Sequence, residues 1–179
     1  MANIPNAITA IRLVGVFPVA MLTGRGFYLL ALVLFIALAL TDGLDGWLAR
    51  KYGWVTSFGK IFDPTADKVF LLGTLFLLVP PDFVLGFLFI CFYEALLFLT
   101  AAAAYICPGK HLVLGANRYG KIKAASEIVL IVLFFGVRMG LGVSDNILHI
   151  VFIAVMLAAI GSLAGRWGFF RSKEKTARS

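Results

Sequence analysis

Long apolar stretches separated by short breaks run through almost the whole chain. The breaks carry residues that favour turns, for example Gly-Arg-Gly at residues 24–26 and Pro-Pro-Asp at residues 80–82. The apolar stretches are continuous rather than alternating, which favours helices over strands. Because a helix needs about 20 mostly apolar residues to cross a bilayer, the pattern predicts six membrane-spanning helices. They are expected at residues 7–23, 27–50, 60–79, 83–106, 121–141 and 146–169.

The composition supports an all-α integral membrane protein. The 179 residues are 61% hydrophobic and 14% charged, whereas a soluble domain is about 45–50% apolar and about 25% charged. Six spans account for nearly the whole length, so we expect one membrane-embedded domain over residues 1–179. The first apolar run lacks a small-residue cleavage site, so we interpret it as a span and not as a signal peptide.

Lys and Arg are distributed unevenly over the two sides that six spans would create. Of the 16 basic residues, only Arg25 and Arg138 fall on one side. The positive-inside rule then predicts that the other side, with both termini, faces the cytoplasm. We therefore expect a multi-pass protein of the cytoplasmic (inner) membrane. This asymmetry and attraction to anionic headgroups account for the net charge of +7, so no nucleic acid partner is expected.

Four aspartates fall at the cytoplasmic ends of the second and third predicted spans. The charge-free parts of these spans, residues 27–41 and 69–79, are too short to cross a bilayer alone. Each helix must therefore include the neighbouring acidic stretch. Spacings of three and four residues place each pair on one helix face. The residues are Asp42 and Asp45 on the second span, and Asp63 and Asp67 on the third.

These carboxylates predict a divalent metal site. Ionised carboxylates at membrane depth are costly unless they are paired or coordinated, and four together would repel one another. Oxygen ligands without a nearby His or Cys favour Mg²⁺ or Mn²⁺ over Zn²⁺, and such ions commonly serve diphosphate chemistry. Two other interpretations stay open. The aspartates could only form ion pairs, with Arg50, Lys60, Lys68 or Arg12. They could also form a carboxylate relay for ion-coupled transport, although transporter sites usually lie near the midplane.

The residues between the aspartates complete a longer pattern. It resembles the D-x-x-D-G-x-x-A-R-x8-G-x-x-x-D-x-x-x-D signature of the CDP-alcohol phosphatidyltransferase family, and residues 3–12 resemble the start of bacterial members. The resemblance implies a six-helix CDP-alcohol phosphotransferase-type bundle and a homodimer. It also implies an activity, in which an acceptor hydroxyl attacks the lipid-bearing phosphorus of CDP-diacylglycerol and CMP leaves.

Site roles follow from the resemblance, position by position. The four aspartates would bind one or two metal ions, and Asp67 would also be the general base for the acceptor hydroxyl. Arg50 would contact the diphosphate as a fixed cation, or could instead be a helix-end residue reaching the interface. The implied CDP-lipid-binding residues are Asn6, Gly46, Ala49, Arg50, Thr56 and Gly59.

The acceptor is suggested by two further stretches. Residues 63–68 (Asp-Pro-Thr-Ala-Asp-Lys) and 120–123 (Gly-Lys-Ile-Lys) resemble the phosphatidylglycerophosphate and cardiolipin synthase branch. The favoured acceptor is glycerol 3-phosphate, with its phosphate held by Arg118, Lys121 and Lys123. These cations could instead be membrane anchors, with Lys123 paired to Glu127. Inositol phosphate, phosphatidylglycerol and serine remain alternative acceptors. A cation-coupled transporter and a liponucleotide binder are the alternatives outside the enzyme class.

Two regions depart from the pattern of that branch. Ala124 and Glu127 stand where Thr and Gln are usual, and Tyr93-Glu94 stands where an Arg-acid pair is common. Glu94 lies in the middle of a predicted span, where an unpaired carboxylate is costly. We therefore expect Glu94 to face the bundle, in either a functional or a structural hydrogen bond.

Overall fold

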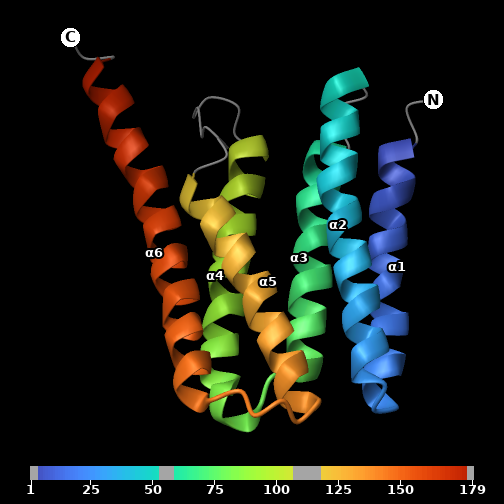
Figure 1. The fold of residues 1–179 in the computed structure, drawn as a ribbon. Helices are drawn as coiled ribbons and strands as arrows, with labels where there is room; N and C mark the ends of the chain where they lie inside the picture. The colour runs from blue at the N-terminus through green and yellow to red at the C-terminus, as the bar shows by residue number, and fades with distance from the viewer. Residues whose placement is uncertain (1–3, 53–58, 107–117, 177–179) are drawn as a thin grey trace. The chain divides into compact units, whose positions relative to one another are not determined.

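A computed structural model of the chain describes the backbone of residues 4–52, 59–106 and 118–176, and the side chains of residues 11–41, 66–99 and 120–162. The described residues form six α-helices and one short 3-10 helix, with no strand among them (Figure 1). The elements are α1 (Ile4–Gly24), α2 (Tyr28–Tyr52), α3 (Gly59–Leu78), η1 (Pro81–Phe83), α4 (Val84–Ile106), α5 (Arg118–Arg138) and α6 (Asp145–Thr176).

Each predicted span coincides with one helix, and the all-helical prediction is confirmed for the described residues. The largest difference is at the end of α6, which continues to Thr176 although the predicted span ends at residue 169. The extension is rich in Lys, Arg and Glu, which are good helix formers. The helix therefore continues beyond the apolar stretch, and the prediction ended too early because it was based on apolar residues alone.

The prediction that the helices cross a membrane is confirmed in part, for two of them. Among the described residues, Pro81–Leu99 and Asp145–Ser162 are long and apolar enough to cross a membrane. The apolar stretches Ile11–Gly24 and Tyr28–Thr41 are shorter. Six spans therefore remain a prediction.

The chain divides into two compact units. Unit 1 comprises Met1–Pro80 with Phe134–Gly142, and unit 2 comprises Pro81–Leu133 with Val143–Ser179. Unit 1 thus contains α1, α2, α3 and the last turns of α5. Unit 2 contains η1, α4, α6 and the larger part of α5.

In unit 1, α1 packs against both α2 and α3. Gly15 allows the close approach to α2, because a Cβ built there would lie 2.5 Å from the Leu38 Cδ1 atom. The core is aromatic: the rings of Phe35 and Phe70 stack with their centroids 5.3 Å apart, and Phe135 lies 6.3 Å from Phe35. Small residues at helix contacts and large rings between the helices hold this unit together.

The opposite face of α1 is an exposed apolar stripe. Ile11, Val14, Phe17 and Met21 recur every three to four residues, and each is more than half exposed. Such a stripe would be unfavourable in water, because large contiguous apolar patches are rare on soluble monomers. It suits contact with lipid tails.

In unit 2, α4 packs against α6 and against η1. Gly86 lies directly against the Phe152 ring. The Phe83 ring completes this contact, with its centroid 4.7 Å from that of His149 and 5.6 Å from that of Phe152. His149 therefore has a packing role.

Candidate functional site

The four predicted metal-binding positions all lie within helices, as the span lengths require. Asp42 and Asp45 belong to α2, and Asp63 and Asp67 belong to α3. The C-terminal end of α2 and the N-terminal ends of α1 and α3 lie at the same end of unit 1 (Figure 1). Of these aspartates, Asp67 is the one whose side chain the structure describes.

Asp67 is held by Arg12. The Arg12 Nη1 atom donates a hydrogen bond to Asp67 Oδ1 and forms an ion pair with it. The pair joins α1 to α3 across 55 positions of sequence. The Arg12 side chain is 3% exposed and that of Asp67 is 29% exposed. The guanidinium is therefore enclosed by the helices, whereas the carboxylate remains within reach of a ligand.

Arg12 belongs to the inward face of α1. Gly15, Val19 and Thr23 are also buried on this face, at helical spacing from Arg12. A buried cation at membrane depth requires a partner, and Asp67 supplies one. The ion-pair reading of the aspartates is thus shown for Asp67, and it is compatible with metal binding by the same carboxylate.

One predicted ligand, Asp67, has a described side chain, and its carboxylate is partly accessible. Carboxylate oxygens are ligands that suit Mg²⁺ or Mn²⁺. The described side chains contain no group of three or more His, Cys, Asp or Glu. Three of the four aspartates lie outside that set, so the metal site stays a prediction.

The predicted CDP-lipid residues are placed by backbone only. Asn6 belongs to α1, Gly46, Ala49 and Arg50 to α2, and Gly59 begins α3. Thr56 lies outside the described residues.

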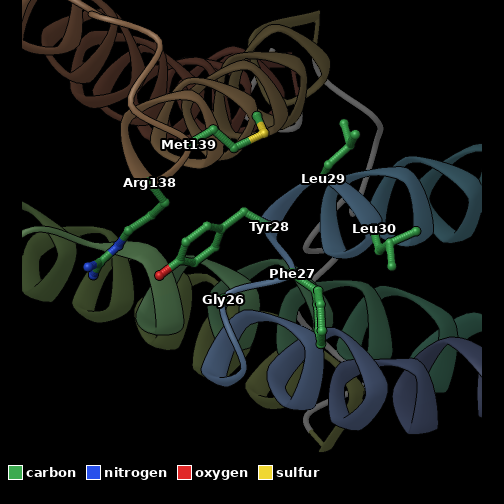
Figure 2. Close-up of a pocket in the computed structure, with 7 residues that line it drawn as sticks. All are labelled: Gly26, Phe27, Tyr28, Leu29, Leu30, Arg138 and Met139. Atoms are coloured by element: carbon green, nitrogen blue, oxygen red, sulfur yellow. The ribbon is translucent and has the colours of Figure 1, made fainter.

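A hollow of about 400 Å³ in unit 1 lies away from the aspartates. It is formed at the turn between α1 and α2, by residues 26–30, together with Arg138 and Met139 (Figure 2). Its lining contains no carboxylate and lies at the opposite ends of α1 and α2 from the signature. It therefore lacks the groups that metal-assisted phosphoryl transfer requires.

Unit 2 contains a buried cluster of charged side chains around Lys123. The Lys123 Nζ atom forms ion pairs with Glu94 of α4 and with Glu127 of α5, the latter at 3.1 Å from Oε1. It also lies 4.9 Å from the centroid of the Tyr93 ring. Each of these four residues is at most 5% exposed. We call Tyr93, Glu94, Lys123 and Glu127 the lysine cluster.

The lysine cluster confirms the expectation that Glu94 faces a neighbouring helix. It also shows the Lys123–Glu127 pair, which belonged to the alternative interpretation of these cations as membrane anchors. Lys121 is exposed, so it lies on a different face of α5 from the buried Lys123, as residues two apart on a helix must. Arg118 is the first residue of α5, and its side chain is outside the described set. The acceptor-phosphate role of these cations stays a prediction.

Comparison with known proteins assigns the family. The model of the CDP-alcohol phosphatidyltransferase family matches residues 2–164, nearly the whole chain. The chain belongs to this family. The matched range contains α1 to α5 and most of α6, and therefore both Asp67 and the lysine cluster.

Several curated relatives carry one name, CDP-diacylglycerol–glycerol-3-phosphate 3-phosphatidyltransferase. The Treponema pallidum protein is 42% identical over 113 residues, which cover 62% of this chain and 50% of that protein. The Bacillus subtilis protein is 32% identical over 146 residues, covering 73% and 75% respectively. The Mycoplasma pneumoniae protein is 36% identical over 102 residues, covering 56% and 44%. The match thus spans about half of the Treponema and Mycoplasma relatives and three quarters of the Bacillus relative.

Two contacts between helices were not identified uniquely from the sequence. Arg12 was one of four possible ion-pair partners of the aspartates, and the Glu94–Lys123 pair was not predicted. The sequence indicates that Arg12 and Glu94 need partners, because each is a charged residue among apolar ones. It does not indicate which residue each partner is.

Proposed function

We propose that this chain is a membrane-embedded transferase that moves the phosphatidyl group of CDP-diacylglycerol to a hydroxyl of glycerol 3-phosphate. The products are CMP and phosphatidylglycerophosphate. The family membership supports the reaction class, and the shared name of the relatives supports the acceptor. The structural observation that carries the proposal is Asp67, a partly accessible carboxylate fixed by a buried arginine at the signature end of α3.

In the proposed reaction, Asp67 accepts the proton of the acceptor hydroxyl and CMP is the leaving group. The acceptor hydroxyl oxygen bonds to the lipid-bearing phosphorus, and its proton passes to a carboxylate oxygen of Asp67. The bond from that phosphorus to the bridging oxygen breaks, and CMP leaves with the electron pair. Mg²⁺ or Mn²⁺ held by the four aspartates would neutralise charge on the diphosphate.

The remaining assignments complete the proposal. Arg50 and the small residues Gly46, Ala49 and Gly59 would hold the nucleotide end of the donor, with Asn6 and Thr56 near the cytidine. The protein would cross the membrane six times as one catalytic domain, with its termini and active site in the cytoplasm. A homodimer is proposed as in other family members. The exposed apolar stripe of α1 supports contact with lipid or with a second copy.

The acceptor is tested by a panel assay. Purified protein receives CDP-diacylglycerol, Mg²⁺ or Mn²⁺, and one of glycerol 3-phosphate, inositol phosphate, phosphatidylglycerol or serine. We expect CMP release with glycerol 3-phosphate and loss of that release with a chelator. Release with another acceptor alone would replace the proposed substrate, and no metal-dependent release with any acceptor would refute the enzyme assignment.

The role of Asp67 is tested by Asp67→Asn. The amide cannot take the hydroxyl proton, so we expect turnover to fall by about 10²- to 10⁴-fold, the usual contribution of general-base catalysis. Binding of CDP-diacylglycerol, measured at equilibrium, should be mostly retained. Turnover close to that of the wild type would exclude Asp67 as the base.

A further inference from the structure

The hollow at the turn between α1 and α2 contains a cation and no acidic residue in its lining. Its volume of about 400 Å³ lies within the range of about 300–1,000 Å³ that is usual for small-molecule sites. The cation is Arg138, whose side chain is exposed. Among the side chains that the structure describes, none forms an ion pair or a hydrogen bond with the Arg138 guanidinium. An anion in the hollow would therefore gain a cationic partner without displacing a carboxylate.

Tyr28 adds a second hydrogen-bond donor to the hollow. It is the first residue of α2, and Arg138 is the last residue of α5. Figure 2 shows the Tyr28 ring and the Arg138 side chain extending to the same side of the hollow. A guanidinium and a phenolic hydroxyl both donate hydrogen bonds, and arginine suits phosphate oxygens in particular. The rest of the lining is mainly apolar, so the hollow offers both donors and apolar surface to one ligand.

An exposed apolar stripe continues from the hollow along α2. Leu29, Val33, Ile36 and Leu40 are exposed and recur every three to four residues, so they share one face of the helix. Leu29 also lines the hollow. From residue 29 to residue 40 the helix rises by about 16 Å, at about 1.5 Å per residue. One leaflet is half of a hydrocarbon core of about 30 Å, so the stripe has the length of one leaflet.

We propose that the hollow binds the headgroup phosphate of an anionic phospholipid, whose acyl chain lies along the apolar stripe of α2. Arg138 and Tyr28 donate hydrogen bonds to the phosphate oxygens. A zwitterionic headgroup would bring a second cation to the arginine, so the site favours a headgroup with net negative charge. The site lies at the opposite ends of α1 and α2 from the aspartates, so this lipid is distinct from the proposed substrate. The inference rests on the proposed membrane topology, in which this end faces the non-cytoplasmic side, and not on the proposed reaction.

Arg138→Gln tests the cation. The variant loses a charge-assisted hydrogen bond, so we expect the dissociation constant for phosphatidylglycerol to rise about tenfold. Because the Arg138 side chain is exposed, the melting temperature without added lipid should stay at the wild-type value. Tyr28→Phe keeps the ring and removes the hydroxyl, and it should weaken binding by about threefold.

Arg25→Gln is the matched control. Arg25 is also exposed, and it directly precedes the residues that line the hollow. Charges that make no direct contact are largely screened at about 0.15 M salt, so we expect a change of at most about twofold. Equal weakening in Arg25→Gln and Arg138→Gln would show a general attraction of anionic lipid to this surface, and would overturn the site.

Binding is measured by native mass spectrometry of purified protein in a nonionic detergent, which counts both bound lipids and protein copies. The ligands are phosphatidylglycerol, phosphatidylcholine, the deacylated phosphatidylglycerol headgroup and inorganic phosphate. We expect the wild type to retain one more phosphatidylglycerol per copy than Arg138→Gln, and to bind the other three ligands at least tenfold more weakly, since each lacks either the net charge or the acyl chain.

Three results would overturn the inference. Equal binding of phosphatidylcholine would remove the argument from charge, and equal binding of the free headgroup or inorganic phosphate would show an anion site without a lipid. A change in the number of protein copies in Arg138→Gln, with unchanged lipid binding, would assign the hollow to a contact with a second copy. None of these measurements depends on CMP release, so the lipid site and the proposed reaction can fail separately.

Discussion

The Arg12–Asp67 pair permits a quantitative prediction for Arg12→Gln. The substitution removes a cation from a site where its side chain is 3% exposed, and leaves Asp67, which is 29% exposed. Breaking a fully buried pair costs about 3–5 kcal/mol because a charge is left behind without compensation. Since the carboxylate left here is partly accessible to water, we expect a smaller loss, of about 2 kcal/mol, comparable to one hydrogen bond to a charged group.

The same variant should weaken metal binding. Arg12 fixes the orientation of a carboxylate that is proposed to bind the metal, and loss of such an outer partner typically costs about 10- to 100-fold in metal affinity or activity. Two measurements follow on purified protein. One is the unfolding midpoint without metal. The other is the Mn²⁺ concentration that gives half of the metal-induced thermal stabilisation, which does not depend on turnover.

Arg25→Gln is the matched control, because Arg25 is an exposed arginine that directly follows the C-terminal end of α1. A double-mutant cycle with Asp67→Asn isolates the pair, and contacting charged residues usually give coupling energies of about 0.5–3 kcal/mol. If the effects of Arg12→Gln and Asp67→Asn were additive, the contact would carry no energy. If Arg12→Gln behaved like Arg25→Gln in both measurements, the positioning role of Arg12 would be excluded.

Two glycines give further predictions on stability, with Gly24→Ala as the control because a Cβ at that position meets no atom within 4 Å. Gly86→Ala should lower the free energy of unfolding by about 1–3 kcal/mol, since the new Cβ would overlap the Phe152 ring. Denaturant titration measures this free energy, and a value at or above that of Gly24→Ala would contradict the prediction. Gly26→Ala should lower the free energy of unfolding by about 1–2 kcal/mol, because Gly26 has a φ of 80°, which is strained for residues with a Cβ. An unchanged midpoint of denaturant unfolding would contradict this and show that the turn relaxes.

The sequence predicted the helices well because each depends on a local property. An apolar stretch of sufficient length, ended by Gly or Pro, determines where a membrane helix begins and ends. The Lys123–Glu127 pair was predictable for the same reason, since a spacing of four places both residues on one face of a helix. The family was also predictable, because its signature is a set of fixed spacings within residues 42–67.

Contacts between helices were not predictable, because no local rule relates their partners. Arg12 lies 55 positions from Asp67, and several cations near the aspartates satisfied the sequence criteria equally well. The partner was determined by the packing of α1 on α3, where a Cβ atom built on Gly73 would lie 3.2 Å from the Val16 Cγ1 atom. Side-chain partners thus depend on how closely two helices approach.

The charges of α3 illustrate the conflict between spanning a membrane and catalysing a reaction in it. The first half of α3 contains four charged residues, Lys60, Asp63, Asp67 and Lys68. Asp63 and Asp67 belong to the signature that the sequence resembles, so this part of the helix is less hydrophobic at the place where the proposed chemistry occurs.

Stability alone does not explain the buried charges of this protein. Replacing a buried ion pair by apolar side chains of similar volume is often neutral or stabilising, and both units already contain apolar cores. The Arg12–Asp67 pair joins α1 to α3, and the Glu94–Lys123 pair joins α4 to α5, so each places a buried cation against a carboxylate of another helix. Each pair therefore constrains which faces of the two helices meet, because a shift that separated the partners would leave a buried charge without compensation.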